Sequence, residues 1–334
     1  MGFDQITAVM NPTITDSAVK AAIAAIGSES ATVAEKIQML IEIAQGFHQQ
    51  PKTAQDLRNA MGLYYRAYQM CGEEYPLLQA RALVGMAGTL QSIPNGGSQL
   101  LLEAKANYEQ ALPILQQLAL PAEVAEAQMN LGLVLQSLVP FNLARMTDSI
   151  QAYHQALQVF TWDNHPQEYA ILYNNIAIAY LSMPMASQQE YLRQGLAVQS
   201  FAVALQHINL IDHPREYAML QNNLGNALQY LVSSHPLDNN LRAIAAYDEA
   251  LKVRNPRDTP LEYANTISNK ANALFNLPDD PDKPELGNPH NLLQAYNYYQ
   301  EAWAIFTKHE QQEQAEIVAQ AIQDIEAQMR VTMD

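Results

Sequence analysis

The pattern of apolar and polar positions repeats along the chain in two alternating segments. One segment carries an alanine after a Glu-Tyr or Glu-Val pair, at Ala125, Ala170, Ala218 and Ala264, which are 45, 48 and 46 positions apart. The other segment carries an aromatic residue followed three positions later by alanine, in the pairs Tyr64/Ala67, Tyr108/Ala111, Tyr153/Ala156, Phe201/Ala204, Tyr247/Ala250 and Tyr299/Ala302. Because the two independent markers recur with similar spacing and alternate along the chain, we interpret them as the two helices of one structural repeat.

The first segment of each repeat begins in the way that helices begin. Pro260 follows Thr259, and Glu262 lies three positions beyond Thr259, which is the pattern of a capping box. Glu168 and Glu216 hold the same place in earlier repeats. A small residue then returns in the middle of the segment, at Gly132, Ala177, Gly225 and Ala271. Since a glycine inside a helix normally lowers stability, its return predicts that a second helix packs closely there.

These motifs resemble the tetratricopeptide repeat (TPR) family. Its first helix carries Asn-Leu-Gly, matched by Asn223-Leu224-Gly225, and its second carries Ala-x-x-x-Tyr-x-x-Ala, matched from Ala243 to Ala250. The family's usual unit has about 34 residues. The longer repeats of this chain look similar to the long variants of bacterial signalling and scaffold proteins. The resemblance implies an all-α, right-handed superhelical solenoid of about six TPR-like units, with the first helices lining a concave groove.

The repeat markers also give the expected organisation of the chain. A helical cap is expected over residues 1–30 and a TPR-like repeat array over residues 31–308. The units of the array are placed near 31–72, 76–117, 121–162, 166–210, 214–255 and 260–308. A polar capping helix and tail are expected over 309–334, and the acidic, proline-rich stretch 278–289 is expected to be a mobile insertion within the sixth unit.

A ladder of carboxamides is predicted on the groove face of the first helices. At about 100° per residue, the repeated asparagine lies away from the leucine and tyrosine positions that pack inside. Amides offer donors and acceptors without net charge, which suits the backbone of a segment from another protein. We therefore predict a partner-binding groove made by Asn130, Asn174, Asn175, Asn222, Asn223, Asn226, Asn269 and Asn272, together with Arg81.

Some of these asparagines have a second interpretation. The asparagine of each Asn-Leu-Gly motif or its relative also suits a hydrogen bond between neighbouring repeats, which concerns Asn130, Asn175, Asn223 and Asn269. The additional asparagines, Asn174, Asn222, Asn226 and Asn272, favour the binding role because no packing pattern calls for an amide there. On this interpretation, replacing Asn222 and Asn226 by alanine weakens partner binding and leaves thermal unfolding nearly unchanged.

Composition narrows the class of partner. The 334 residues include 34 acidic and 18 basic ones, for a formal net charge of -16. A chain with a net negative charge is unsuited to binding phosphate backbones, so nucleic acid is not an expected partner. The expected partner is a neutral or basic protein or peptide segment. Arg81 is the one basic residue recognised on the groove face, which counts against a clamp for a C-terminal carboxylate.

The sequence shows no motif for catalysis, a cofactor or a metal. His165 and His213 stand before prolines at equivalent positions in adjacent repeats, which indicates helix starts. Asn95-Gly96-Gly97 is typical of a turn and not of a phosphate loop. The single cysteine, Cys71, excludes an internal disulfide and favours a reducing compartment. With no recognisable signal peptide and no membrane-spanning segment, a cytoplasmic, non-enzymatic protein is expected.

The function that these observations favour is a scaffold or adaptor that binds a client segment in the groove of the repeat array. The alternative is an assembly or maturation chaperone for a subunit of a cofactor-containing enzyme complex, in which the groove shields the immature subunit. The two differ in their client, which the residues do not name.

Overall fold

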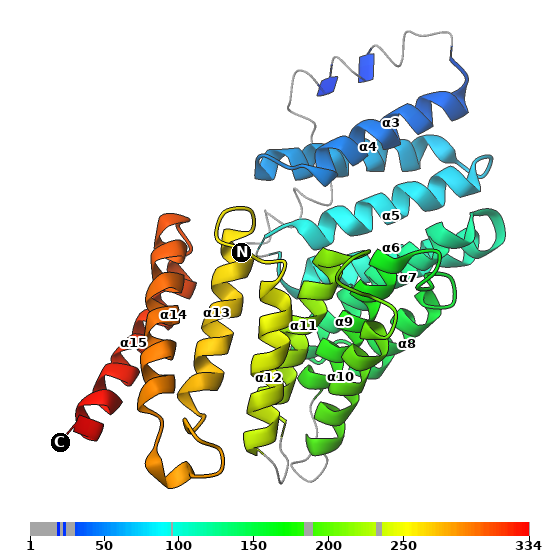
Figure 1. The fold of residues 1–334 in the computed structure, drawn as a ribbon. Coiled ribbons are helices and arrows are strands. Elements are labelled where there is room, and N and C mark those ends of the chain that lie inside the picture. Colours follow the sequence, from blue (N-terminus) through cyan, green and yellow to red (C-terminus); the bar gives the residue numbers. More distant parts are fainter. Residues whose placement is uncertain are drawn as a thin grey trace. The chain divides into compact units, whose positions relative to one another are not determined.

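The computed structural model describes residues 19–20, 23–24, 31–94, 96–183, 190–231 and 236–333, and these residues form an all-α fold (Figure 1). The expected cap over 1–30 lies almost wholly outside the described residues. The long helices are α3 (Val33–Gln49), α4 (Ala54–Cys71), α5 (Pro76–Ser92), α6 (Gly97–Leu118), α7 (Pro121–Leu138), α8 (Met146–Ala156), α9 (Pro166–Ser182), α10 (Glu190–Leu205), α11 (Pro214–Gln229), α12 (Pro236–Leu251), α13 (Pro260–Phe275), α14 (Pro289–Lys308) and α15 (Gln312–Met333).

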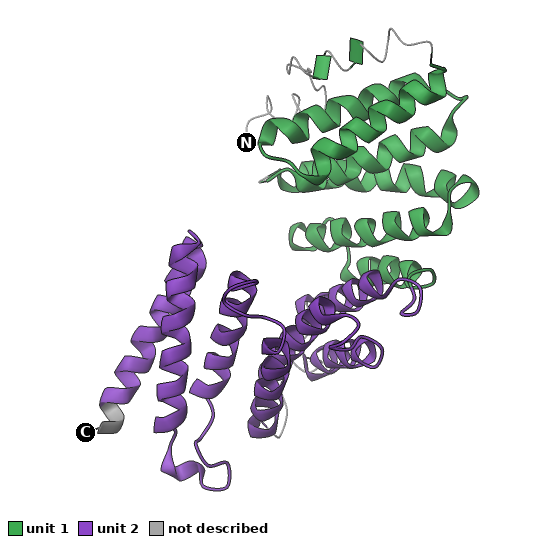
Figure 2. Cartoon of the chain, turned by 45° about the horizontal axis from the view of Figure 1, so that its top comes forward, with its two compact units in different colours: residues 1–160 green, residues 161–334 purple. Residues whose placement is uncertain are grey.

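The chain divides into two compact units, residues 1–160 and 161–334, which we call unit 1 and unit 2 (Figure 2). Unit 1 contains α3 to α8, and unit 2 contains α9 to α15. Within each unit, every helix packs against the next one along the chain. The first helices of successive pairs also contact each other, α3 with α5 and α5 with α7 in unit 1, and α9 with α11 and α11 with α13 in unit 2. The prediction of an all-α helical-repeat fold is therefore confirmed for the described residues.

The small residue in the middle of the first helix makes room for a tyrosine of the second helix. A Cβ atom on Gly132 of α7 would lie 2.5 Å from Cε1 of Tyr153 in α8. A Cβ atom on Gly225 of α11 would lie 2.5 Å from Cε1 of Tyr247 in α12. Both tyrosine side chains are fully buried. The predicted close packing of a second helix on these glycines is confirmed.

The buried tyrosines are also held by their hydroxyl groups. The Tyr153 hydroxyl donates to Oε1 of Gln136 at 2.9 Å. In unit 2, Nε2 of Gln229 donates to the Tyr247 hydroxyl at 2.6 Å, and that hydroxyl donates to Oδ1 of Asn226 at 2.7 Å. Each buried phenol therefore has a polar partner on the first helix of its own pair, as a buried hydroxyl requires.

One predicted helix start is wrong in its details. Thr259 precedes α13, but its side chain makes no capping bond to that helix. Its hydroxyl instead accepts the backbone N–H of Asn255 at 3.0 Å, because the turn before α13 folds that N–H back toward it. A capping box does occur at the start of α3, where Glu35 N–H donates to the Thr32 hydroxyl at 3.3 Å and Thr32 N–H donates to Glu35 Oε2 at 2.7 Å.

The acidic stretch 278–289 connects α13 to α14, and it is anchored at its beginning. The Asp279 carboxylate accepts the backbone N–H groups of His290 and Asn291, each at 2.8 Å. The Asn291 amide donates to the carbonyls of Leu277 and Pro278, each at 3.1 Å. An acidic side chain on the first N–H groups of a helix stabilises that end. These bonds hold the beginning of the stretch against the start of α14, and the mobility of the remaining residues stays a prediction.

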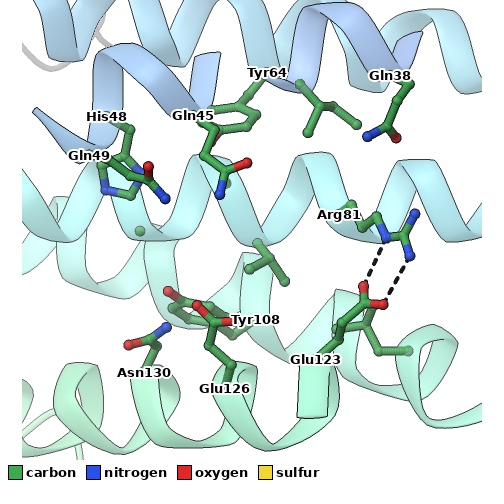
Figure 3. Close-up of a pocket in the computed structure, with 15 residues that line it drawn as sticks. Gln38, Gln45, His48, Gln49, Tyr64, Arg81, Tyr108, Glu123, Glu126 and Asn130 are labelled. Atoms are coloured by element: carbon green, nitrogen blue, oxygen red, sulfur yellow. Dashed lines mark hydrogen bonds and ion pairs between the residues drawn. The ribbon is translucent and has the colours of Figure 1, made fainter. Parts of the chain in front are cut away.

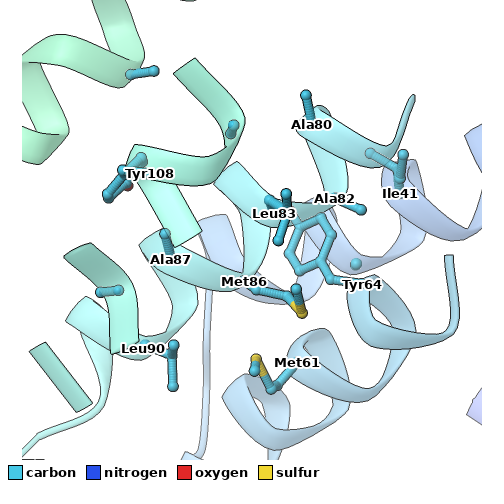
Figure 4. Packing of buried hydrophobic residues seen from close by; sticks show 14 of the residues in the cluster. Ile41, Met61, Tyr64, Ala80, Ala82, Leu83, Met86, Ala87, Leu90 and Tyr108 are labelled. Atoms are coloured by element: carbon cyan, nitrogen blue, oxygen red, sulfur yellow. The ribbon is translucent and has the colours of Figure 1, made fainter. Parts of the chain in front are cut away.

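The core of unit 1 is one continuous cluster of apolar side chains (Figure 4). Tyr64 of α4 and Tyr108 of α6 belong to it together with Leu83 and Met86 of α5. Cys71 lies in the same cluster with 1% of its surface exposed, and its thiol donates to the carbonyl of Ala67. Burial raises the pKa of the Cys71 thiol to about 11. Cys71 is therefore a packing residue of the core and not a reactive thiol.

We expect Cys71 to react with a thiol reagent only after unit 1 opens. At about pH 8, a thiol with a pKa of about 11 is thiolate in about one molecule in a thousand, and the sulfur is covered by its neighbours. Labelling with an aromatic disulfide reagent, with and without urea, measures this difference. Labelling of the folded protein as fast as that of the unfolded chain would contradict the burial.

Candidate functional site

Unit 1 contains a polar pocket on the side formed by its first helices (Figure 3). Its volume is about 540 Å³, which lies in the range of ligand-binding pockets. Helices α3, α5 and α7 supply most of the lining residues, and α4 and α6 supply the others. The lining residues are Gln38, Ile41, Gln45, His48, Gln49, Tyr64, Arg81, Val84, Gly85, Gly88, Tyr108, Leu115, Glu123, Glu126 and Asn130.

Two of the pocket's lining positions on α5 are glycine, where other first helices carry larger residues. Gly85 lies five positions after Ala80, the place that Asn130 holds after Ala125. A Cβ atom on Gly85 would lie 2.2 Å from Cε1 of Tyr64. A Cβ atom on Gly88 would lie 2.8 Å from Cε1 of His48. With no side chain at these two positions, the rings of Tyr64 and His48 lie close to α5, and both residues line the pocket.

Sequence reasoning missed this pocket, although its signal was present. The two glycines lie three positions apart on one face of α5, which predicts close approach of neighbouring side chains to that face. The repeat that contains them matches the family motif weakly, and the asparagine that marks the groove in later repeats is absent from it.

Arg81 and Glu123 close one end of the pocket. Nε of Arg81 donates to Oε2 of Glu123 at 2.8 Å, and Nη2 donates to Oε1 at 2.9 Å, which joins α5 to α7. Their mutual hydrogen bonds raise the pKa of Arg81 and lower the pKa of Glu123. Arg81 therefore lines the pocket, and its charge is matched by the Glu123 carboxylate in a bidentate pair.

The other end of the pocket holds Glu126, Asn130 and Tyr108 on one side, and His48 and Gln49 on the other (Figure 3). Burial lowers the pKa of His48, so its ring is mostly neutral at pH 7. Burial, together with the negative charge of Glu126, raises the pKa of Tyr108, which stays a neutral phenol. Glu126 is exposed at the pocket edge and brings a negative charge to this end.

The predicted asparagines of unit 2 form a chain of hydrogen bonds across α9, α11 and α13. Nδ2 of Asn223 donates to Oδ1 of Asn174 at 2.7 Å, and Nδ2 of Asn269 donates to Oδ1 of Asn222 at 3.4 Å. Within α11, Nδ2 of Asn222 donates to Oδ1 of Asn223 at 2.9 Å. Within α9, Nδ2 of Asn174 donates to Oδ1 of Asn175 at 3.4 Å. We call this set the amide ladder.

Asn226 and Asn272 belong to a second network beside the amide ladder. Asn226 accepts the hydroxyl of Tyr247, as described above. Nδ2 of Asn272 donates to Oε1 of Gln229 at 2.8 Å, and Nε2 of Gln229 also donates to the backbone carbonyl of Asn269 at 2.9 Å. These bonds connect α11, α12 and α13.

The positions of Asn174 and Asn222 correct the reasoning that favoured a binding role for them. Only 8% of Asn174 and 6% of Asn222 is exposed, and each amide is hydrogen-bonded to the first helix of a neighbouring pair. The physical reason is that two adjacent asparagines on one helix can form hydrogen bonds to both neighbouring first helices. In α11, Asn223 reaches back to α9 while Asn222 receives a bond from α13. A packing role therefore does call for these amides.

The remaining sequence candidates are placed as follows. His165 and His213 stand at the N-caps of α9 and α11, where the sequence placed helix starts. Asn95 and His235 lie outside the described residues. Within the described ranges, no group of three or more His, Cys, Asp or Glu side chains is arranged to hold a metal ion. None of the described helices combines the length and apolar character needed to cross a bilayer.

Comparison with known proteins finds solved structures of limited similarity and no family. The crystal structure of BtubC (BKLC) from P. vanneervenii is similar with a TM-score of 0.48 and 20% identity, over 73% of this chain and 97% of that chain. The TPR2AB domain of yeast Sti1, solved in complex with pHSP90, has a TM-score of 0.30 and 13% identity, over 88% of this chain and 99% of that chain. No family model matches the sequence, and the search of curated proteins finds no relative. These values assign no function to the chain.

Proposed function

We propose that the chain is a protein-interaction scaffold or adaptor and that it binds a segment of another protein in the unit 1 pocket. The observation that carries this proposal is the pocket itself, which has a volume of about 540 Å³ and lies on the first-helix side of the repeats. Gln45, Gln49 and Asn130 line it with carboxamides, which can pair with the N–H and C=O groups of an extended backbone.

The helical frame makes such a pocket ready for binding. The lining side chains come from packed helices that bury Tyr64 and Tyr108 between them, so the pocket has its shape before a partner arrives. A preformed site reduces the ordering cost of binding a flexible segment. In unit 2, we assign the amide ladder to holding the first helices together, and its half-buried members Asn175, Asn223 and Asn269 to that same role.

The charges of the pocket and of the whole chain favour a neutral or basic partner. The pocket has one full positive charge, Arg81, against the two carboxylates Glu123 and Glu126, so its lining is net negative. The whole chain has a formal net charge of -16. A negative surface raises the encounter rate with basic segments and disfavours acidic ones.

The proposal is tested with a substitution at an exposed position that blocks the pocket. Gln45 is exposed on α3 and lines the pocket, so Gln45→Trp fills part of the cavity without changing the core. Peptides are selected from a displayed library of random sequences on the full chain and then measured against each variant. We expect Gln45→Trp to bind them at least about tenfold more weakly, a loss of about 1.4 kcal/mol.

The matched control is Gln110→Trp, an equal change at an exposed position of α6 that does not line the pocket. It is expected to bind as the wild type does. Equal binding by Gln45→Trp would place the site elsewhere, and a selection that enriches no peptide would overturn the proposed function.

A further inference from the structure

A half-exposed tryptophan lies in unit 2, on the turn before α9. Trp162 has 49% of its surface exposed. Its indole stacks on the imidazole ring of His207, with the ring centroids 4.5 Å apart and an angle of 10° between the planes. The His207 ring in turn meets the ring of Tyr169 at an angle of 81°, with the centroids 6.1 Å apart. One face of the indole is therefore covered by His207, and its exposed surface lies on the other face and along the edges.

The backbone on both sides of this stack is held by hydrogen bonds. In the turn that contains Trp162, the N–H of His165 donates to the carbonyl of Thr161 at 2.8 Å. At the end of α10, the N–H of His207 donates to the carbonyl of Ala204 at 3.1 Å. The indole is thus presented from an ordered turn and supported by a second one. A side chain that is already ordered loses less freedom when a partner binds.

Carboxylates outnumber cations on the two turns that carry the stack. Asp163 follows Trp162 directly, and the hydroxyl of Thr161 donates to its carboxylate, which lowers the pKa of Asp163 and keeps it ionised. Glu168 lies in the first turn of α9. Among the described residues, neither Asp163 nor Glu168 takes part in an ion pair. The corresponding turn and helix start at α11 carry the charged residues Asp212, Arg215 and Glu216. With four carboxylates and one guanidinium, these segments are net negative.

We propose that the exposed face of Trp162 binds one arginine side chain of a partner protein and that this part of unit 2 is a second interaction surface. A guanidinium is flat and always charged, so it can stack on an aromatic face. Tryptophan offers the best face for such a contact among the aromatic side chains. The carboxylates of Asp163 and Glu168 supply the negative potential that attracts the arginine and disfavours an acidic segment.

The chemistry of the surface favours arginine over the other side chains that could cover an indole. The ammonium group of lysine is compact and strongly hydrated, so it does not stack as a plane. An apolar side chain could cover the ring, but it gains nothing from the neighbouring carboxylates. The surface also differs from the unit 1 pocket in its residues, since every residue that lines the pocket belongs to unit 1 and Trp162 belongs to unit 2.

The experiment compares two peptides of equal charge. The probes are dye-labelled peptides with capped ends, in which either arginine or lysine alternates with glycine, and their binding to the full chain is measured by fluorescence anisotropy. We expect Trp162→Ser to weaken binding of the arginine peptide by about threefold to tenfold. The same substitution should change binding of the lysine peptide by less than about twofold, because general charge attraction remains. Trp162→Phe keeps an aromatic face and should lose less than Trp162→Ser.

The matched control is Trp303→Ser. Trp303 is another half-exposed tryptophan of unit 2, on α14, with 41% of its surface exposed, and its replacement is expected to leave binding of both peptides unchanged. Circular dichroism during urea unfolding verifies that each variant is folded.

Four results would overturn the proposal. They are no binding of the arginine peptide to the wild type, equal losses for Trp162→Ser and Trp303→Ser, an equal loss of both peptides with Trp162→Ser, and unchanged binding of the arginine peptide by Trp162→Ser. If Gln45→Trp then abolishes that unchanged binding, the arginine binds in the unit 1 pocket. The proposed function of unit 1 is tested separately by Gln45→Trp with its own selected peptides, so the two proposals can fail independently.

Discussion

Gly225→Ala is expected to destabilise unit 2 by about 1–3 kcal/mol, although alanine is the better helix former. The new methyl group would lie 2.5 Å from Cε1 of Tyr247, which is fully buried. The ring has little room to move away, because its hydroxyl is bonded to Asn226 and Gln229. The strain of this contact therefore exceeds the gain in helix propensity.

The measurement is urea unfolding followed by tryptophan fluorescence. The two tryptophans, Trp162 and Trp303, both belong to unit 2, so the signal reports on that unit. The matched control is Gly195→Ala in α10 of the same unit, where a new Cβ atom meets no described atom within 4 Å. This control is expected to stabilise unit 2 by about 0.5–1 kcal/mol. Stabilisation by both substitutions would contradict the close packing at Gly225.

Asn222→Ala combined with Asn226→Ala is expected to lower the stability of unit 2 by about 1–3 kcal/mol. The first change removes the acceptor of the Asn269 amide and the donor to Asn223, and the second removes the acceptor of the Tyr247 hydroxyl. Groups left buried without partners carry the full cost of their lost hydration. This result is the opposite of the sequence-based expectation, in which thermal unfolding stays nearly unchanged.

Asn265→Ala is the control for the double variant. Asn265 is exposed on α13 of the same unit, and its replacement gives the gain in helix propensity of one of the two substitutions, so its effect should stay within about 0.5 kcal/mol. Urea unfolding of the three proteins side by side provides the comparison. If the double variant unfolds at the urea concentration of the wild type, the amide ladder contributes no stability.

The helices and their pairing could be predicted because their signals are local. The alanines of the first helices and the aromatic residues of the second helices recur at similar distances, and each marks a position that is buried in one helix pair. The contact between Gly225 and Tyr247 followed from the same reasoning, since a repeated glycine inside a helix needs a close neighbour.

The partners of the asparagines could not be predicted in the same way. Their common face follows from helical periodicity, but the bond from Asn223 to Asn174 joins residues 49 positions apart. Whether two such amides meet depends on the distance and the tilt between α9 and α11, which periodicity does not contain. The pocket was missed for a related reason: its lining comes from five helices, α3 to α7, and their relative positions are not contained in the pattern of apolar residues.

The amide ladder permits unit 2 to differ in its number of repeats. The two bonds of the amide ladder that join first helices follow one rule, in which an asparagine donates to the asparagine that lies one motif position earlier in the preceding first helix, as Asn223 does to Asn174 and Asn269 does to Asn222. Loss of the whole segment from α11 to α12 would bring Asn269 to Asn174 with that rule intact, and a duplicated copy would extend it. Gain or loss of a complete repeat thus preserves the amide-ladder bonds that a single substitution breaks, so the length of this unit can change more readily than the asparagines of the ladder.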